Sequence, residues 1–501
     1  MTVSVNSAAL TGIEAVLIQV ETRVCAGVSY FIVGLAGEAV RESLFRVESA
    51  ITTAGFDMPR QKILISLAPA GIRKEGAVFD LPVALSILAA SGQLDEQLFA
   101  DTVFTGELSL TGKLRPVKGT LSMAMEARRS GAQRLFVPQE NALEAAMVSD
   151  LAVYGFETLN QVIDFLTNKS AVEPAKIDQQ EISRKDALYC TDFVDVRGQA
   201  AVKRALAIMA AGGHNALLCG PPGTGKTMLA SRLPGIMPQM SLTEALETTR
   251  IYSVAGQLDQ QGLMTQRPFR APHHTSSDIA LVGGGPVAMP GEISLAHHGI
   301  LFLDELPEFK RRVLEVLRQP LEERQVSISR ASYTVNFPAN FLLLAAMNPC
   351  PCGFHGHPER KCSCTPQAVR MYRSKLSGPL LDRIDLHIPV GPADLKQSAP
   401  VETSAMIRQR VSAARAIQLQ RAGVCNAQLS TAQVNTFCGL GKTELEVLHQ
   451  AMAQHKLSAR SYERILKIAR TVADLAGATN IELGHLAEAI RLRRSEPGRS
   501  A

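Results

Sequence analysis

The residues with the clearest chemical purpose form one glycine-rich run near the middle of the chain. The run has the spacing GxxxxGK[ST] and consists of Gly220, Pro221, Pro222, Gly223, Thr224, Gly225, Lys226 and Thr227. Glycines at this spacing let successive backbone N–H groups turn inward around phosphate oxygens. The lysine then neutralises the β- and γ-phosphates, and the hydroxyl after it ligates Mg²⁺. The run therefore predicts a site for ATP and Mg²⁺.

Two carboxylates end an apolar segment further along the chain. Residues 299–303 (GILFL) precede Asp304 and Glu305. A strand buried on both faces of a parallel sheet has this composition, and ligands sit at the carboxyl ends of such strands. We expect Asp304 to hold Mg²⁺ through water, and Glu305 to polarise the water that attacks the γ-phosphate.

Two later polar residues extend this catalytic set. Asn348 follows the apolar run 341–347, where an amide can hold the attacking water; a plain strand-end turn is the alternative. Arg383 could reach the nucleotide of a neighbouring subunit as an arginine finger. A surface ion pair with Asp382 or Asp385 is the alternative for Arg383.

A further arginine stands at the start of an expected helix in the C-terminal part. Arg460 lies in the first turn after Leu457 and Ser458. The helix dipole disfavours a cation at that position, so a nearby phosphate would explain it. Arg464, one turn later on the same face, is an alternative candidate for this phosphate contact. An arginine that contacts only solvent is equally compatible with the sequence.

Four cysteines form a compact cluster in a loop rich in glycine, histidine and proline. They are Cys350, Cys352, Cys362 and Cys364, in two C-x-C pairs. Four thiols so close together suit a tetrahedral structural Zn²⁺ site. Either His355 or His357 could replace one thiol, and unliganded thiols or a redox switch remain alternatives.

Bulk properties restrict the class of protein. The chain has 501 residues, nine cysteines and a formal net charge of +5. Its length suggests roughly two to four domains. The low net charge means that any nucleic-acid surface is a local basic lining. The sequence shows no signal peptide and no apolar run long enough to span a membrane. Nine cysteines in a chain without an export signal favour a reducing compartment, so we expect a cytoplasmic protein without membrane contact.

The pattern of apolar residues divides the chain into four segments. Strand-like and helix-like runs alternate over 1–165, and a polar linker covers 166–190. Alternating strands and helices over 191–395 carry the nucleotide motifs, and a helical pattern fills 396–501. The predicted fold class is therefore α/β with a helical C-terminal domain.

The motif set resembles that of the AAA+ ATPases, with a Walker A loop, a Walker B strand, a sensor Asn, an arginine finger and a helical lid. More narrowly, the chain resembles the magnesium-chelatase-like ComM/YifB family. The match is carried by residues 269–275 (FRAPHHT), 290–298 (PGEISLAHH) and 347–353 (MNPCPCG). The resemblance implies a homohexameric helicase that drives branch migration on single-stranded and branched DNA in natural transformation. It also makes recombination proteins candidate partners.

The same resemblance places a β-hairpin before the sensor strand. Residues 324–330 and 333–337 alternate polar and apolar side chains as two such strands would. In related ring helicases the hairpin projects into the pore. Arg330 at its tip would then meet the phosphate backbone, and Tyr333 could stack on a base. A hairpin packed against its own domain is the alternative.

The N-terminal segment resembles the C-terminal domain of Lon proteases and the corresponding domain of the recombination protein RadA. Residues 73–81 (RKEGAVFDL) and 105–117 (TGELSLTGKLRPV) carry the match. The position of the protease's nucleophilic serine holds Val78, and the position of its lysine falls near Leu121. Lys118 is close in sequence but does not fall on this lysine position. A Ser–Lys dyad needs both groups, so we expect a binding or assembly module.

Three functions follow from these resemblances. The first is a DNA motor built as a ring of ATPase subunits. The second is a chelatase-type motor that remodels a protein partner. The Lon-like N-terminal domain argues against this function, because the resemblance implies that chelatase motor subunits lack such a domain. The third, a non-enzymatic nucleotide-dependent scaffold, fits poorly with a complete set of catalytic residues.

Overall fold

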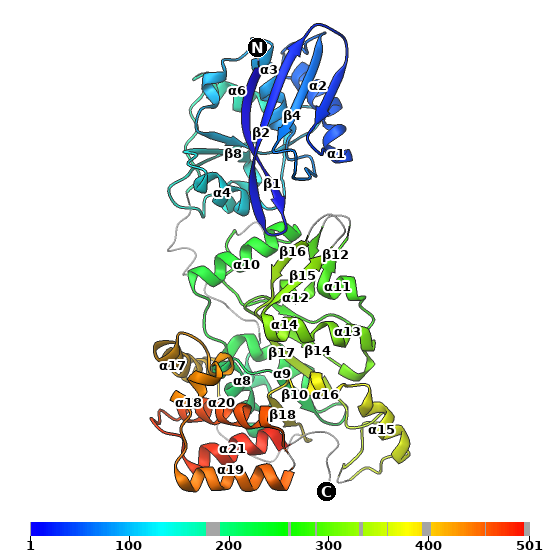
Figure 1. The fold of residues 1–501 in the computed structure, drawn as a ribbon, viewed down its shortest axis with the longest axis vertical. Helices are drawn as coiled ribbons and strands as arrows, with labels where there is room; N and C mark the ends of the chain where they lie inside the picture. Colours follow the sequence, from blue (N-terminus) through cyan, green and yellow to red (C-terminus); the bar gives the residue numbers. More distant parts are fainter. Residues whose placement is uncertain are drawn as a thin grey trace.

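The computed structural model describes residues 2–176, 191–258, 262–285, 288–329, 334–357, 359–392, 402–455 and 457–494. Figure 1 shows an elongated molecule with an N-terminal domain at one end, an α/β domain in the middle and C-terminal helices at the other end. Each part has its own apolar core, as expected for a chain of this length.

A seven-stranded sheet forms the centre of the N-terminal domain. Its strands run in the spatial order β3-β4-β2-β1-β5-β8-β9. They are β1 (Thr2–Thr11), β2 (Glu14–Cys25), β3 (Tyr30–Val33), β4 (Lys62–Ala68), β5 (Thr102–Phe104), β8 (Arg134–Pro138) and β9 (Ala152–Phe156). The short strands β6 (Glu107–Leu108) and β7 (Leu114–Arg115) pair separately.

Helices cover both faces of this sheet. They are α1 (Glu38–Arg41), α2 (Ser43–Thr53), α3 (Asp80–Ala90), α4 (Thr120–Arg129), α5 (Ala142–Ala145) and α6 (Leu159–Leu166). Successive residues of β5 enter different apolar clusters, because strand side chains alternate between faces. Phe104 packs with α2, α3 and α6, whereas Val103 packs with α4 and α5.

The middle domain is built on a five-stranded sheet whose pairings are all parallel. The spatial order is β11-β14-β17-β10-β18. The strands are β10 (Ala216–Cys219), β11 (Phe269–Arg270), β14 (Ile300–Leu303), β17 (Leu342–Met347) and β18 (Leu386–Pro389). Every residue of β14 and β17 is buried, as expected for parallel strands covered on both faces. The expected α/β class with a parallel-sheet core is confirmed.

The helices of the middle domain complete its two faces. They are α8 (Ala200–Gly212), α9 (Lys226–Arg232), α10 (Leu242–Ala255), α11 (Asp278–Val282), α12 (Glu292–Leu295), α13 (Arg311–Val316), α14 (Arg318–Glu323), α15 (Pro366–Ser374) and α16 (Gly378–Leu381). Two hairpins stand at the end that faces the N-terminal domain (Figure 1). They consist of β12 (Gly283–Gly284) with β13 (Met289–Pro290), and β15 (Gln325–Ser329) with β16 (Thr334–Pro338).

The C-terminal part is helical, as its sequence pattern predicts. It contains α17 (Ser404–Ala422), α18 (Thr431–Phe437), α19 (Lys442–His455), α20 (Ala459–Leu475) and α21 (Leu483–Arg494). Ser430 and Gln433 form a capping box at the start of α18, which satisfies N–H groups that lack helical partners. The apolar face of α20 joins these helices to α8 in one core.

Helix α10 joins the middle domain to the N-terminal domain. Its Leu246 packs into the cluster around α4. The Arg250 guanidinium donates to the carbonyl of Ile13 at 3.2 Å, and Gly119 N–H donates to the carbonyl of Ser253 at 3.3 Å. The turn between β1 and β2 also reaches the β15–β16 hairpin, where Gly12 lies against Val335.

The segment expected as a linker begins on the N-terminal domain. Val172 packs against the core of that domain, and Ala175 N–H donates to the carbonyl of Val153 in β9 at 2.8 Å. Contacts with the N-terminal domain thus continue to Ala175, and residues 177–190 lie outside the described part of the chain. Among the described residues, no helix is long and apolar enough to cross a membrane.

Candidate nucleotide-binding site

The phosphate loop connects β10 to α9 at the carboxyl edge of the parallel sheet. Lys226 is the first residue of α9, and its side chain is largely buried. Its Nζ donates to the carbonyls of Gly220 at 2.7 Å and Pro221 at 2.8 Å. Burial lowers the pKa of Lys226, while Asp304 acts in the opposite direction. The lysine is therefore held inside the loop at the position that the motif predicts.

Thr227 and Asp304 are brought together from two strands that are not neighbours in the sheet. The Thr227 hydroxyl donates to Asp304 Oδ2 at 2.7 Å. Asp304 directly follows β14, while Thr227 lies just beyond the loop that follows β10. A hydroxyl beside a carboxylate is a ligand pair that suits Mg²⁺, which prefers oxygen. These residues fit the metal role expected of them.

Glu305 has an unusual backbone conformation. Its φ is +51°, in the left-handed region, and its N–H donates to Asp304 Oδ1 at 2.9 Å. Non-glycine residues in this region are uncommon and concentrate at functional sites. The Glu305 side chain remains 54% exposed. The strand end therefore presents this carboxylate to solvent, where a general base needs to be.

His274 is a residue of this site to which the sequence analysis assigned no role. Its Nδ1 lies 3.7 Å from Glu305 Oε2. The histidine belongs to the segment after β11, and β11 pairs in parallel with β14. The sequence could in principle have indicated His274, because segments that follow adjacent parallel strands lie at the same edge of the sheet.

Asn348 follows β17, the strand between β14 and β10. Its Oδ1 accepts a hydrogen bond from Lys226 Nζ at 3.1 Å. The structure thus brings Asn348 into one cluster with Lys226, Thr227, Asp304 and Glu305, although these residues come from three separate parts of the sequence.

Arg383 lies at the opposite edge of the sheet from the phosphate loop. It precedes β18, whose first residue, Leu386, pairs with Ala216 at the start of β10. Arg383 Nη2 contacts Glu322 Oε1 at 2.5 Å, and Nη1 donates to the carbonyl of Pro379 at 2.7 Å. The ion-pair partner is therefore Glu322, not Asp382 or Asp385 as the alternative held. Arg383 is far from the nucleotide site of its own chain.

The two arginines near the start of α20 differ in their surroundings. Arg464 Nη1 contacts Asp385 Oδ1 at 2.6 Å. Burial raises the pKa of Asp385, but Arg464 and His214 more than reverse this and hold it below its usual range. Arg464 is thus engaged in a structural ion pair at the amino edge of the sheet. Arg460, one turn earlier, is exposed.

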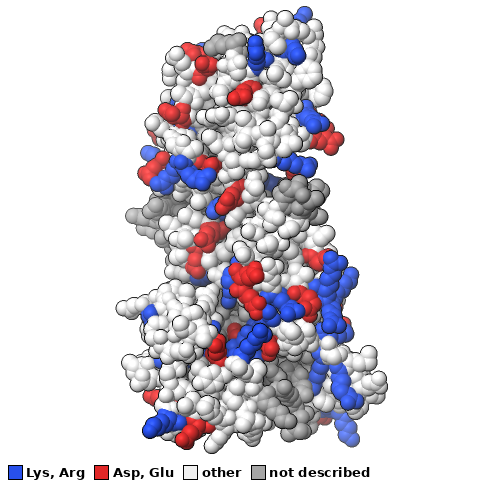
Figure 2. All heavy atoms as spheres, in the orientation of Figure 1, with Lys and Arg blue, Asp and Glu red and all other residues white. Residues whose placement is uncertain are grey.

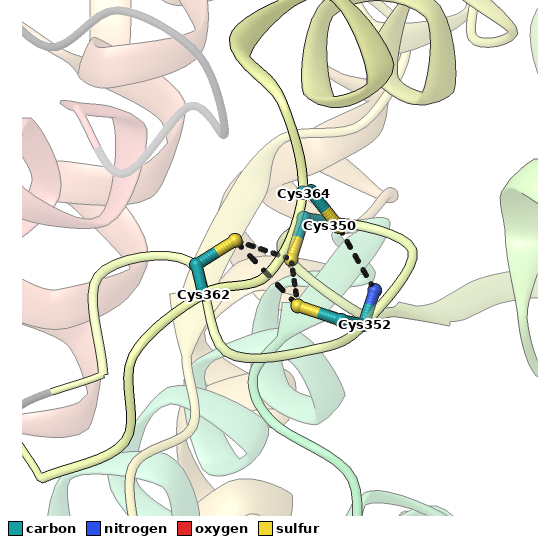
Figure 3. Close-up of side chains that lie close together, drawn as sticks. All are labelled: Cys350, Cys352, Cys362 and Cys364. Carbon is teal, nitrogen blue, oxygen red and sulfur yellow. Dashed lines mark hydrogen bonds between the residues drawn. The ribbon is translucent and has the colours of Figure 1, made fainter.

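The four cysteines converge in one loop after β17 (Figure 3). Cys350 Sγ lies 3.4 Å from Cys352 Sγ and 3.6 Å from Cys362 Sγ, and Cys352 Sγ lies 3.5 Å from Cys362 Sγ. Cys364 Sγ is within 4.8 Å of the other three. Sulfurs bound tetrahedrally to Zn²⁺ at about 2.3 Å stand about 3.8 Å apart. The four thiols can hold zinc with small adjustments.

The histidines of the same loop are not needed for this set. His357 Nδ1 accepts hydrogen bonds from the backbone N–H groups of Glu359 and Arg360, both at 3.1 Å. Neither His357 nor His355 belongs to the group of converging ligand atoms.

A second group of converging ligand atoms consists of Glu247, His297 and His298. His297 Nδ1 accepts the backbone N–H of Asn340 at 3.0 Å. In a neutral ring the proton is then on Nε2, which faces Glu247 Oε2 at 3.3 Å. A protonated Nε2 cannot ligate a metal. We therefore interpret this group as a hydrogen-bonded contact between α10 and the residues before β14.

The expected DNA contacts fall outside the described residues. Strands β15 and β16 of the hairpin are present, but Arg330 and Tyr333, which lie between them in the sequence, are not described. Elsewhere, Figure 2 shows lysine and arginine side chains gathered along one side of the molecule, over α13 and α15. Lys310, Arg311, Arg312 and Arg370 are exposed there. The basic surface is local, as the low net charge predicts.

The two positions at which a protease dyad would stand hold buried apolar side chains, and these belong to two different apolar clusters. Val78 is 7% exposed and Leu121 is fully buried. Lys118, the nearest lysine in sequence, lies against Gly256 at the end of α10. Its amine is therefore part of the contact with the middle domain.

Comparisons with known proteins agree with this division of the chain. A family described as "Magnesium chelatase, subunit ChlI" matches residues 192–398. "Subunit ChlI of Mg-chelatase" matches residues 20–141, and "Magnesium chelatase, subunit ChlI C-terminal" matches residues 401–493.

Individual relatives extend the similarity over the whole chain. Competence protein ComM of Haemophilus influenzae is 45% identical over 498 residues, which is 98% of this chain and 97% of that protein. The uncharacterized protein YifB of Escherichia coli is 44% identical over 495 residues, 98% of this chain and 96% of that one. A mitochondrial Lon protease homolog of Caenorhabditis elegans is 33% identical over 118 residues, 22% of this chain and 12% of its own. The chain therefore belongs to the ComM/YifB family of magnesium-chelatase-like AAA+ proteins.

Proposed function

We propose that this chain is an ATP-dependent DNA helicase that works as a homohexameric ring and promotes branch migration during recombination in natural transformation. The observation that carries the proposal is the division of the nucleotide machinery between two edges of one sheet. Lys226, Asp304, Glu305 and Asn348 meet at one edge, and Arg383 stands at the other. Such a chain needs a neighbour to complete its site. The DNA part rests on the similarity to the protein named competence protein ComM.

The residues at the carboxyl edge divide the work of ATP hydrolysis among them. Lys226 neutralises charge on the β- and γ-phosphates, while Thr227 and Asp304 hold Mg²⁺, which stabilises charge on the transferring phosphoryl group. Glu305 takes the proton of the attacking water, and Asn348 orients that water. His274 lies beside Glu305 and orients the Glu305 carboxylate.

A neighbouring subunit supplies the remaining cation. Arg383 leaves Glu322 and turns to the γ-phosphate bound next door, where an arginine finger stabilises the transition state. Arg460 is the second candidate for a phosphate contact, because it is exposed while Arg464 is engaged by Asp385. Turnover then depends on the contact between subunits.

A mixing experiment tests this dependence. Arg383→Ala subunits keep an intact phosphate loop, and Lys226→Ala subunits keep an intact arginine. Each variant alone is expected to be inactive, and a mixture regains ATP hydrolysis at interfaces that combine the two intact halves. The control is Arg312→Ala, an exposed arginine paired with Asp278, which should retain full turnover. No recovery in the mixture would leave Arg383 as a structural partner of Glu322.

The DNA part is tested by ATP hydrolysis with and without nucleic acid. We expect single-stranded DNA and a synthetic four-way junction to stimulate turnover, and the junction to be converted to its products. Arg330→Ala should weaken DNA binding and reduce its salt dependence while sparing basal hydrolysis; Tyr333 is the proposed stacking partner. Lys226→Ala controls for contaminating ATPases. If no DNA changes the rate of ATP hydrolysis, the proposed helicase function is rejected.

The alternative function is a chelatase-type motor that remodels a protein partner. It is favoured by the names of the matching families, all of which refer to magnesium chelatase. Because the family that matches residues 20–141 also has this name, the N-terminal domain does not separate the two functions. A DNA-independent ATPase stimulated by a protein client would establish the alternative.

The four converging thiols are proposed as a structural Zn²⁺ site. Cys350, Cys352, Cys362 and Cys364 provide the complete ligand set of such a site, with no position left for a catalytic water. Metal analysis of the purified protein should find about one Zn²⁺ per chain. A folded protein free of metal would reject this assignment.

A further inference from the structure

The thiol loop lies directly against the phosphate loop. Gly353, the residue after Cys352, has φ +83°, and a β-carbon added there would lie 2.4 Å from Pro222 Cδ and 3.1 Å from Pro222 Cγ. Real β-carbons do not approach other atoms this closely, so only glycine permits the contact. Pro222 is a member of the phosphate loop. The two loops are therefore packed at van der Waals distance through a residue without a side chain.

A second contact joins the same two loops. Asn348 Oδ1 accepts from Lys226 Nζ at 3.1 Å, and Asn348 stands two residues before Cys350. The short segment from Asn348 to Gly353 thus contacts the phosphate loop at both of its ends, and Cys350 and Cys352 lie between these contacts. Gly353 N–H also donates to the carbonyl of Cys350 at 3.0 Å, which closes the turn.

The other two thiols anchor this segment to the next helix. Cys364 immediately precedes Thr365, the N-cap of α15. The Arg373 side chain of α15 donates to the carbonyl of Pro349 at 3.1 Å. A metal bound by all four thiols would therefore tie the segment 348–353 to the start of α15, and so fix one wall of the phosphate loop.

We propose that metal occupancy of the four-thiol site sets the nucleotide affinity, because the metal holds Gly353 against Pro222 and keeps the phosphate loop in its binding shape. This inference rests on the zinc site and the phosphate loop proposed above. Among the described residues of the range 350–365, none belongs to a helix or a strand. Without the metal cross-link, this stretch gains conformational freedom that nucleotide binding must remove again. We expect loss of zinc to weaken nucleotide binding about tenfold, which corresponds to about 1.4 kcal/mol.

Two glycines of the same loop allow a matched test of the contact. Gly353 and Gly356 have nearly the same left-handed backbone, with φ +83° and +79°. Alanine therefore costs similar backbone strain at either position. Only at residue 353 does the new methyl group meet Pro222; at residue 356 it meets nothing within 4 Å. The difference between the two variants isolates the contact between the loops.

The measurement is the affinity of the full-length protein for a fluorescent ADP analogue, with zinc content determined on the same samples. Gly353→Ala should bind zinc like the wild type and bind nucleotide about tenfold more weakly. Gly356→Ala should match the wild type in both measurements. Equal nucleotide affinities of the two zinc-loaded variants would overturn the proposal.

A second pair of variants tests the metal itself. Cys364→Ser should lose zinc and weaken nucleotide binding to a similar degree, whereas Cys25→Ser, a free thiol of the N-terminal domain, should change neither. Circular dichroism checks that both variants are folded. Nucleotide binding at wild-type strength in folded, zinc-free Cys364→Ser overturns the coupling. If the purified wild-type protein contains no zinc, the metal-site assignment is rejected. If the wild-type protein does not bind nucleotide, the phosphate-loop assignment is rejected. The two failures can therefore be told apart from a failure of the coupling between the sites.

Discussion

Lys226 in the middle domain and Lys74 in the N-terminal domain are both buried, and both donate to backbone carbonyls of the loop that precedes them. Lys226 Nζ contacts Gly220 and Pro221, and Lys74 Nζ contacts the carbonyl of Pro69. Burial lowers the pKa of each amine. A buried lysine that follows a strand and donates to nearby backbone carbonyls is therefore not by itself a sign of catalysis.

The acidic residues of the two domains make the difference. Beside Lys226 stand Asp304 and Glu305, and Glu305 is more than half exposed. In the N-terminal domain, Asp80 is fully buried and satisfied by Arg46 at 2.7 and 3.0 Å and by Leu108 N–H at 3.1 Å. One region keeps acids open to a ligand, and the other pairs them internally. The comparison suggests that the middle domain does chemistry and that the N-terminal domain uses its charges for stability.

The largest expected effect tests the chemical side of this comparison. Glu305→Gln should lower ATP turnover by about 10²–10⁴-fold, the usual contribution of a general base, and leave nucleotide binding intact. Glu308→Gln is the control, because Glu308 is close in sequence and forms an exposed pair with Lys375. Single-turnover hydrolysis and nucleotide binding are measured on both. Turnover retained in Glu305→Gln would show that another group accepts the proton.

The next effect compares the two lysines directly. Lys226→Ala should weaken ATP binding about 100-fold, as expected from the loss of charge-assisted hydrogen bonds worth about 3 kcal/mol. Lys74→Met, which keeps the volume of the side chain, should leave ATP affinity unchanged. Isothermal titration with ATP and Mg²⁺ measures both. The comparison breaks down if the two substitutions weaken binding equally.

These residues also show what a sequence can reveal. The phosphate loop, Asp304, Glu305 and the four thiols were predictable because their ligand atoms are close along the chain or end apolar strands. The cap of α18 and the apolar pattern of β14 and β17 depend on equally local rules. The α/β class followed from the alternation of such runs.

Contacts that depend on strand order were not predictable in the same way. The Arg383–Glu322 pair, the approach of His274 to Glu305 and the packing of Gly353 on Pro222 join segments that are distant in sequence. Each depends on which strands are neighbours and in which register, and no local pattern specifies this. Sequence reasoning therefore named Arg383, but the ion pair considered as its alternative role was with Asp382 or Asp385 and not with Glu322.

A smaller effect is expected when the internal pairing of the N-terminal domain is broken. Arg46→Ala should destabilise that domain by about 3 kcal/mol at pH 8, because it leaves Asp80 buried without its counterion. Burial already raises the pKa of Asp80 to about 6, although Arg46 acts against it. The protonated form is thus favoured in the folded state, so stability falls as pH rises through that value.

The destabilisation by Arg46→Ala should accordingly shrink when the pH is lowered toward 5, since a neutral Asp80 needs no counterion. Thermal unfolding of the wild type and the variant at both pH values measures this. Glu48→Ala, at an exposed position on the same helix α2, is the control. A loss of stability that stays constant with pH would mean that Arg46 contributes through packing and not through its charge.

The smallest effect concerns the missing nucleophile. Val78→Ser restores the residue type that the Lon resemblance places there, and should cost about 1–2 kcal/mol in stability for burying a hydroxyl in an apolar core. We expect no peptide hydrolysis, because a serine needs an amine within hydrogen-bond reach. Leu121 occupies the expected lysine position, Lys118 lies against Gly256, and the Lys74 amine is held by Pro69. Cleavage of a fluorogenic peptide by Val78→Ser but not by wild type would show that one of these amines is free to act, and the N-terminal domain would then resemble the nucleotide site as a centre of chemistry.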